Sequence, residues 1–262
     1  LRSEEEVRAS FETARAESRA AFGSDALYFE KFIERPRHIE FQILADKQGN
    51  VRVLGDRECS IQRRHQKVIE EAPSVALSEE LRNDMAATIF RAMTEAGFLS
   101  AGTIEFLLDE RGERTFLEMN PRIQVEHPVT ELVMGVDLVA EQIRIADGQA
   151  LEVPAQALTP RGHAIECRIN AEDPNTFAPS PGRITELHMA GGTGVRVDSG
   201  VYGGGVVPPH YDPLVAKLVV HAPTRRRAIA KMRRALDETI IGGIRTNIPL
   251  HRRVLGHPAF EE

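Results

Sequence analysis

The sequence feature that most constrains the fold is a pair of neighbouring β segments, AGTIEFLLD and TFLEMN, separated by a short polar stretch. Two such segments this close in the chain predict an antiparallel hairpin. If residues 110–113 form the loop, the ladder begins with Asp109 opposite Arg114. The same register then places Glu105 directly opposite Glu118.

This hairpin predicts a cluster of polar side chains on one face. Asn120 follows Glu118 by two residues, so side-chain alternation directs both towards the face that carries Glu105. Like charges opposed across a sheet repel, and a raised pKa or a bound cation relieves the repulsion. Carboxylate and amide oxygens are hard ligands suited to Mg²⁺ or Mn²⁺ that also bridges nucleotide phosphates. The spacing alone leaves two alternatives, a metal site and an exposed sheet face with ordinary charges.

Helix and strand patterns both occur along the rest of the chain. Helices are predicted over residues 4–22 after Ser3, residues 79–96 after Ser78, a segment that Asp137 caps and that ends before Gly148, and a segment that Thr224 caps. The last of these has an apolar face made of Ala228, Ile229, Met232, Ala235 and Leu236. Strands are predicted over residues 27–33, 37–44, 51–56, 102–109, 115–120, 163–169 and 214–221, with turns and short strands in 177–209.

Composition excludes several classes of protein. The 262 residues can bury a substantial core, and no apolar run approaches the roughly 18 residues of a membrane span. A net charge of −6 argues against a general nucleic-acid binder. Cys59 and Cys167 lie far apart without CxxC spacing, which argues against a disulfide scaffold and favours a reducing cytoplasm. The chain opens on LRSEEEVRAS, without Met or a secretory signal, so a piece of a longer protein is expected.

The run EMNPRIQVEHPVTE, residues 118–131, resembles the signature of biotin carboxylases. ERPRHIEFQIL, RECSIQRRHQKVIEEAP, ECRINAEDP and YDP match the same family in the same order, so the similarity covers essentially the whole chain. This family belongs to the ATP-grasp superfamily, whose Mg-ATP site lies between two α+β domains, one of them a mobile lid. The resemblance implies an α+β ATP-grasp fold with antiparallel sheets and flanking helices. Residues 1–32 would be the tail of the lid, and residues 33–262 most of the C-terminal domain.

The resemblance also implies roles for individual residues. Glu105, Glu118 and Asn120 match the metal-binding positions of the family. The positions that hold bicarbonate match Arg122, Gln124 and the backbone amide of Val125, and Glu126 matches the general base that removes its proton. Lys67 matches the lysine at the γ-phosphate, and Arg168 the residue that stabilises the enolate of biotin. The ATP-binding positions match Glu30, Lys31, Ile33, His38, Gln62, His65 and Leu107.

Without the family, the same residues have plainer interpretations. Glu126 would be a surface or ion-paired Glu, and the basic run around Lys67 a solvated loop. Arg168 would be a strand Arg paired with Glu166, because alternation directs both to one face. Cys167 falls on the opposite face and is expected to be a buried, inert thiol.

The activity that the resemblance implies is Mg-ATP-dependent carboxylation of biotin on a carrier protein by bicarbonate through carboxyphosphate. The family's N-terminal domain and the glycine-rich phosphate loop of its lid are not among these residues, so weak activity is expected from them alone. Two alternatives are kept: another bicarbonate-activating ATP-grasp ligase, and a non-catalytic dimerising fragment.

The partners implied are a biotin carboxyl carrier, a carboxyltransferase and a second copy of the chain, since Arg196 matches a region near the family's dimer interface. The final acceptor is left open among acetyl-CoA (for fatty-acid synthesis), propionyl-CoA, another acyl-CoA and pyruvate. The expected location is the cytoplasm, with an organelle matrix as the alternative.

Overall fold

The structure is a computed structural model that describes residues 3–154 and 159–261. The chain divides into two compact units, Leu1–Glu34 and Arg35–Glu262. None of the described helices is both long and apolar enough to cross a membrane.

The N-terminal unit contains helix α1 (Glu4–Phe22). The Ser3 hydroxyl accepts a hydrogen bond from Glu6 N at 3.2 Å, and Gly23 adopts a left-handed φ of 71° beyond the last turn. Both predicted ends of this helix are therefore confirmed. The strand predicted over residues 27–33 is wrong: these residues form no strand, because the described part of this unit offers no second strand to pair with.

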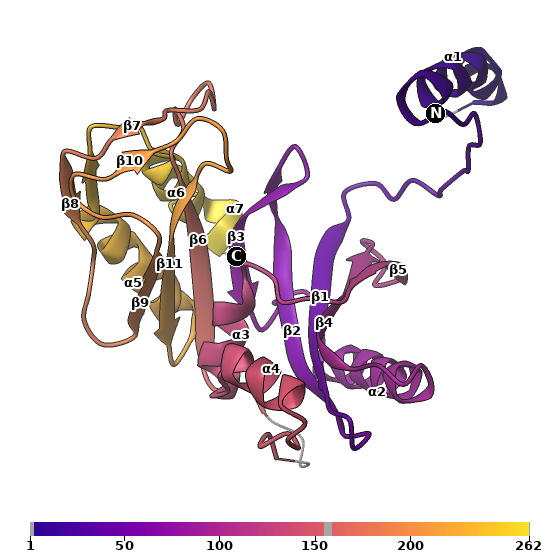
Figure 1. The fold of residues 1–262 in the computed structure, drawn as a ribbon, viewed down its shortest axis with the longest axis horizontal. Coiled ribbons are helices and arrows are strands. Elements are labelled where there is room, and N and C mark those ends of the chain that lie inside the picture. The colour runs from indigo at the N-terminus through magenta and orange to yellow at the C-terminus, as the bar shows by residue number, and fades with distance from the viewer. Residues whose placement is uncertain (1–2, 155–158, 262) are drawn as a thin grey trace. The chain divides into compact units, whose positions relative to one another are not determined.

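The larger unit is built on an eight-stranded sheet with the order β5-β4-β1-β2-β3-β6-β11-β9, and every neighbouring pair is antiparallel (Figure 1). Its strands are β1 (Arg37–Ala45), β2 (Val51–Arg63), β3 (Gln66–Ala72), β4 (Ser100–Leu108), β5 (Arg114–Asn120), β6 (His163–Asn170), β9 (Val195–Ser199) and β11 (Leu214–Ala222). Two small ribbons pair β7 (Gly182–Arg183) with β10 (Val206–Val207) and β8 (Glu186–His188) with β12 (Ile240–Gly242). The expected α+β class with antiparallel sheets and flanking helices is confirmed.

Six helices accompany the sheets in the described part of this unit, and Figure 1 shows α2 on the side of β1 and β4, and α5 on the side of β11. They are α2 (Glu79–Glu95), α3 (His127–Met134), α4 (Leu138–Ala146), α5 (Arg225–Glu238), α6 (Ile248–Leu255) and α7 (Pro258–Glu261). The predicted caps of α2, α4 and α5 are confirmed, because the side chains of Ser78, Asp137 and Thr224 each accept a hydrogen bond from the first turn.

Side-chain alternation sorts apolar cores from a polar face. On β1, Ile39, Phe41 and Ile43 belong to the hydrophobic cluster under α2. Glu40 and Gln42, between them in sequence, are also fully buried but take part in a network of polar side chains. One face of the sheet therefore packs against a helix while the other is available for a buried polar site.

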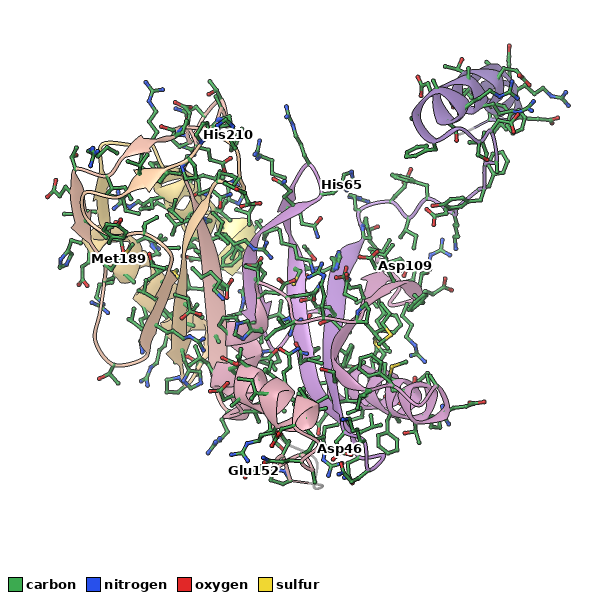
Figure 2. The ribbon with its side chains drawn as sticks, in the orientation of Figure 1. Asp46, His65, Asp109, Glu152, Met189 and His210 are labelled. Carbon is green, nitrogen blue, oxygen red and sulfur yellow. The ribbon has the colours of Figure 1, made fainter. Side chains whose placement is uncertain are left out.

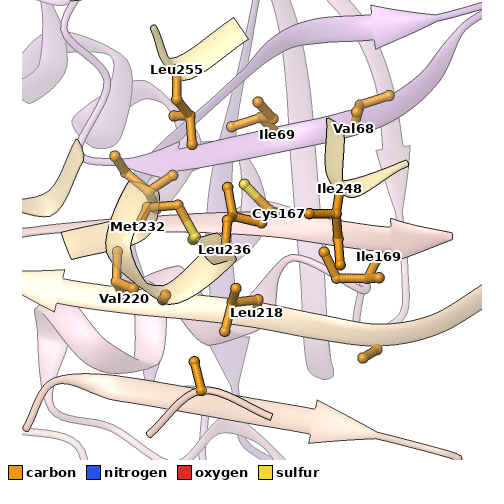
Figure 3. Packing of buried hydrophobic residues seen from close by; sticks show 14 of the residues in the cluster. Val68, Ile69, Cys167, Ile169, Leu218, Val220, Met232, Leu236, Ile248 and Leu255 are labelled. Carbon is orange, nitrogen blue, oxygen red and sulfur yellow. The ribbon is translucent and has the colours of Figure 1, made fainter. Parts of the chain in front are cut away.

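The same division holds on β6. Cys167 is buried in the cluster that α5 covers, and Figure 3 shows it close to Met232, Leu236 and Leu218. All five residues of the predicted apolar face of α5 are buried. Burial raises the pKa of the Cys167 thiol, as expected for an inert structural cysteine. Arg168, the next residue, points to the polar face.

Candidate active site

The β4–β5 hairpin brings together the carboxylates predicted from the sequence. Glu105 pairs directly with Glu118, as predicted, but the outer register is wrong: Arg114 pairs with Leu108, not with Asp109. The Asp109 carboxylate accepts hydrogen bonds from two backbone amides of the turn, which starts the turn one residue early. A register shift between Glu105 and Phe106 compensates, so that the carboxylate pair is retained.

Asn120 lies on the same face, as predicted. Its Nδ2 is 3.1 Å from Glu105 Oε1 and 3.1 Å from Glu118 Oε1. Glu105 is buried and Glu118 is exposed, so the trio spans from the interior to the surface. This donor set fits a hard divalent cation, which would take the place between the carboxylates if the amide turned its oxygen inward.

Lys67, at the start of β3, forms ion pairs with three carboxylates. Its Nζ lies 2.5 Å from Glu40 Oε2, 2.6 Å from Glu126 Oε1 and 3.1 Å from Glu105 Oε1. Burial lowers the pKa of Lys67, but the carboxylates, Glu40 foremost, outweigh it and the net shift is upward. A solvated basic loop is therefore the wrong interpretation for Lys67, whose side chain is largely buried and paired with carboxylates.

The neighbouring basic residues differ from Lys67. Arg64 and His65 are exposed at the tip of the β2–β3 hairpin, where both have positive φ, and Figure 2 labels His65 there. Arg63 instead forms an ion pair with Glu172 at 3.1 Å and lies over the ring of Phe177. Only the hairpin tip behaves as a solvated loop.

Glu126 immediately precedes α3 and is buried. Its Oε1 accepts from Lys67, and its Oε2 accepts from Arg168 Nη2 at 2.9 Å. Helix α3 was not predicted from the sequence, although Pro128 occupies its first turn, where proline is tolerated. Of the two plain interpretations, the ion-paired one is confirmed and the surface one is wrong.

Arg168 reaches Glu126 from β6. Its Nε donates to Glu70 Oε1 on β3 at 2.6 Å, while Nη2 donates to Glu126. The expected pairing of Arg168 with Glu166 is wrong, because Glu70 on the adjacent strand takes that position instead. Arg168 thus bridges two carboxylates from different elements.

The Gln124 side chain forms hydrogen bonds with both Glu105 and Arg57. Its Nε2 donates to Glu105 Oε1 at 2.8 Å, and its Oε1 accepts from Arg57 Nη2 at 3.2 Å. Arg122 is exposed, and its guanidinium lies 3.3 Å from Asn120 Oδ1 and 3.3 Å from the carbonyl of Ile123. The predicted bicarbonate residues therefore follow one another from the surface to the interior.

The predicted ATP residues do not all lie together: they form two groups, and His65 belongs to neither, at the exposed tip of the β2–β3 hairpin. His38 Nδ1 lies 3.1 Å from Gln62 Nε2, and Leu107 is the β4 partner of His38, so these three residues lie together. His38 Nε2 is also 2.7 Å from Glu105 Oε2, next to the predicted metal residues. Glu30, Lys31 and Ile33 belong to the separate N-terminal unit.

Two family models match the chain in succession. Residues 1–153 match the ATP-binding domain of the carbamoyl-phosphate synthase L chain, and residues 166–262 match the biotin carboxylase C-terminal domain. Biotin carboxylase of Haemophilus influenzae is 54% identical over 262 residues, which are 100% of this chain and 58% of that protein. The chain belongs to the biotin carboxylase family.

Solved structures of this family of ATP-dependent ligases agree with the fold. The biotin carboxylase domain dimer of Hydrogenobacter thermophilus 2-oxoglutarate carboxylase, in complex with MgADP, ADP and bicarbonate, has a TM-score of 0.93 and 49% identity, and the match covers 99% of this chain and 57% of that one. Campylobacter jejuni biotin carboxylase has a TM-score of 0.93 and 45% identity, over 99% of this chain and 58% of that one. The chain thus spans less than two thirds of its relatives, and nothing in these comparisons favours the two alternatives kept above.

Sequence reasoning missed one central residue of this candidate site. The Arg57 side chain is fully buried and donates to Glu40 at 2.5 Å and, through its other nitrogens, to Gln42, Thr103, Gln124 and Thr130. Burial raises the pKa of Glu40, but Arg57 and Lys67 outweigh it and bring the pKa to about 2. Arg57 lies in the matched RECSIQRRHQK run, yet its single charge gave no local sign of burial.

Lys217 on β11 was missed as well. Its Nζ donates to the carbonyl of Val125 at 3.1 Å and lies 3.2 Å from Asp198 Oδ2. Lys217 therefore fixes the backbone of the predicted bicarbonate loop. Only the pairing of β6 with β11 brings this residue near, which is a long-range contact that no local pattern reveals.

Proposed function

We propose that the protein containing this chain is a biotin carboxylase, which uses Mg-ATP and bicarbonate to carboxylate biotin on a carrier protein. The observation that carries the proposal is the placement of Glu126, a buried carboxylate with one oxygen on Lys67 and the other on Arg168. Two cations on a single buried carboxylate suit a site that must gather bicarbonate, phosphate and a developing enolate.

Glu126 acts as the general base in this proposal. Bicarbonate binds to the Arg122 guanidinium, the Gln124 amide and the backbone N–H of Val125, and Glu126 takes its proton. The Gln124 side chain is already oriented by Glu105 and Arg57, which reduces the reorganisation needed when the anion binds. The deprotonated bicarbonate attacks the γ-phosphate and gives carboxyphosphate.

In this proposal, Lys67 and the hairpin carboxylates act at the phosphate groups of ATP. Glu105, Glu118 and Asn120 would hold the divalent cation, which neutralises charge on the transferring phosphoryl group. Burial raises the pKa of Glu105, but His38 and Lys67 outweigh it and bring the pKa to about 2, so this ligand is ionised at neutral pH. His38, Gln62, His65 and Leu107, with Glu30, Lys31 and Ile33 from the N-terminal unit, would contact ATP.

Arg168 serves the second half of the reaction. Carboxyphosphate breaks down to CO₂ and phosphate, and phosphate removes the proton from the ureido nitrogen of biotin. The Arg168 guanidinium stabilises the resulting enolate, which captures CO₂. Its two ion pairs hold it at the junction of β6 and the loop before α3.

The wider assembly is part of the same proposal. A carboxyltransferase and a biotin carboxyl carrier would complete the carboxylase, and residues 1–32 would be the tail of the lid. Arg196 on β9 forms an ion pair with Glu131 at 2.6 Å, next to an edge of the sheet that a second copy could cover. The acceptor stays open, because a pyruvate carboxylase chain of Methanothermobacter thermautotrophicus is 53% identical over 258 residues. We place the reaction in the cytoplasm or an organelle matrix.

ATP hydrolysis tests this proposal in the protein that contains the chain, with bicarbonate and free biotin each present and omitted. We expect hydrolysis to require bicarbonate and Mg²⁺ and to rise with biotin. Glu126→Gln should abolish the bicarbonate-dependent part, while Glu113→Gln in the exposed hairpin loop should not. Hydrolysis that ignores biotin would point to another bicarbonate-activating ligase, and none at all to a non-catalytic protein.

A further inference from the structure

A pair of buried carboxyl groups lies behind the residues assigned to bicarbonate and biotin. Glu70 on β3 and Glu166 on β6 are direct partners in the antiparallel ladder, and both are fully buried. Side chains paired in this way have Cβ atoms about 4.5–5.5 Å apart. Neither residue has a role in the chemistry proposed above.

The two carboxyl groups are bonded very differently. Glu70 Oε1 accepts from Arg168 Nε at 2.6 Å, while Glu70 Oε2 has no hydrogen-bond partner among the described residues. Neither oxygen of Glu166 has a hydrogen-bond partner among the residues that the structure describes. An ionised carboxylate without hydrogen bonds is strongly disfavoured in the interior, whereas a protonated one costs far less to bury.

The charged groups that face Glu166 do not satisfy it. They are Glu70 on β3, Arg168 on β6, Lys217 on β11 and Glu126 before α3. Arg168 is already divided between Glu70 and Glu126, and Lys217 is bonded to the Val125 carbonyl and to Asp198. Both cations are therefore committed elsewhere.

Burial raises the pKa of Glu166 well above its usual range, and the charge of Glu70 adds to the increase. Burial also raises the pKa of Glu70, to about 7, although Arg168 opposes it. Two carboxyl groups this close titrate as a pair, so the pair holds a proton at neutral pH. The hydrogen bonds place that proton on Glu166, since Glu70 is the group that Arg168 binds.

The main chain of Arg168 is fixed independently of these carboxyl groups. Its carbonyl oxygen accepts from Asn247 Nδ2 at 2.9 Å and from His251 Nε2 at 2.8 Å, both from the α6 region. With the backbone held, only the direction of the Arg168 side chain is left to be set. Glu70 and Glu126 set it by binding two different nitrogens of the guanidinium, Nε and Nη2.

We propose that Glu70 is a positioning residue that holds Arg168 against Glu126, and that Glu166 carries a proton and is neutral while it does so. An ionised Glu166 would compete with Glu70 for Arg168 and draw Lys217 away from the carbonyl of Val125. The positioning role rests on the proposed function of Arg168, whereas the protonation of Glu166 does not.

Infrared spectroscopy of this chain in heavy water at neutral pH tests the protonation without any activity. We expect a carbonyl band of a protonated, buried carboxyl group that disappears in Glu166→Gln. Glu71→Gln is the matched control, because Glu71 is buried on the same strand as Glu70 but pairs with Arg225 and His163. No such band, or a band that survives in Glu166→Gln, would overturn the neutral Glu166.

Turnover by the protein that contains the chain tests the positioning. Glu166→Gln, which mimics the neutral acid, should keep biotin-dependent turnover within about twofold. Glu70→Gln should lower kcat/KM for biotin by roughly 10- to 100-fold, as misplaced catalytic groups do, and Glu71→Gln should not. Undiminished biotin dependence in Glu70→Gln would overturn the positioning role. Absence of bicarbonate-dependent turnover in the unmodified protein would instead refute the proposed function, and the infrared result would still decide the protonation.

Discussion

At the residue scale, the site is an interior array of charges whose geometry depends on Arg57. Its guanidinium lies between Glu40 and the Gln124 amide, both of which approach groups proposed to act on substrates. Lys67 shares Glu40 with Arg57, so one carboxylate connects a structural cation to a cation proposed to act in catalysis. Loss of Arg57 would leave Glu40 buried with the ion pair to Lys67 and the longer contact to His38.

We predict that Arg57→Met destabilises the chain by about 3 kcal/mol, because removing one partner of a buried ion pair leaves the other charge buried and uncompensated. Urea unfolding followed by circular dichroism measures the free energy. Arg64→Met, at the exposed tip of the β2–β3 hairpin, should change it by less than about 0.5 kcal/mol. Equal effects of the two substitutions would contradict the role given to Arg57.

A second residue-scale prediction concerns pH. Burial raises the pKa of Glu71, but hydrogen bonds from His163 and Arg225 outweigh it and lower the pKa below its usual range. A depressed pKa in the folded state means that Glu71 contributes stability above the unfolded value of about 4.3 and loses it as pH falls. The difference in unfolding free energy between the unmodified chain and Glu71→Gln should therefore be largest near neutrality and shrink below about pH 4. A difference that grows towards acid pH would refute this account.

At the scale of elements, α6 completes the strand that carries Arg168. Asn247 Oδ1 accepts from Asn170 N at 2.8 Å, and its Nδ2 donates to the carbonyl of Arg168. The side chain thus bonds the backbone of β6 as a neighbouring strand would. The Asn247 backbone N–H and the His251 ring also bond carbonyls of β6, so several hydrogen bonds join the start of α6 to the end of this strand.

Asn247→Ala should lower the free energy of unfolding by about 2 kcal/mol, because it removes the side-chain acceptor of Asn170 N and one of the two side-chain donors to the carbonyl of Arg168. Differential scanning calorimetry would register this as a lower Tm. Asn83→Ala, on the exposed face of α2, provides the comparison and should leave Tm nearly unchanged. If Asn247→Ala and Asn83→Ala had the same Tm, the Asn247 side chain would not stabilise the contact between α6 and β6.

Helices whose ends depend on nearby residues could be predicted from the sequence, whereas strands and sites that depend on distant residues could not. Local signals predicted the caps of α1, α2, α4 and α5 and the buried face of α5, because a cap depends on residues within one turn. Strand β3 was missed because its charged residues interrupt any apolar alternation and find their partners on distant elements: Lys67 on Glu126 before α3, and Glu71 on Arg225 of α5. In the same way, Glu105 and Glu118 could be paired from the hairpin, whereas Arg57, Lys217 and Glu70 could not be placed.

At the scale of the whole molecule, the residues proposed to bind the metal, bicarbonate and biotin all belong to one compact unit, residues 35–262. The ATP positions are divided, since Glu30, Lys31 and Ile33 belong to the other unit. The chain covers 58% of its Haemophilus influenzae relative. The chemistry proposed for the complete protein must therefore be measured on a protein that contains this chain.

In the proposed function, bicarbonate activated by Glu126 attacks the γ-phosphate of ATP. Incubation of that protein with ATP, Mg²⁺ and ¹⁸O-labelled bicarbonate, followed by mass spectrometry of the released phosphate, tests it directly. Attack by bicarbonate forms a bond from its oxygen to phosphorus, and that oxygen stays with phosphate when CO₂ leaves. We expect one ¹⁸O atom in each phosphate, and little labelled phosphate from Glu126→Gln. Phosphate released without label would mean that water attacks ATP, which would contradict the account.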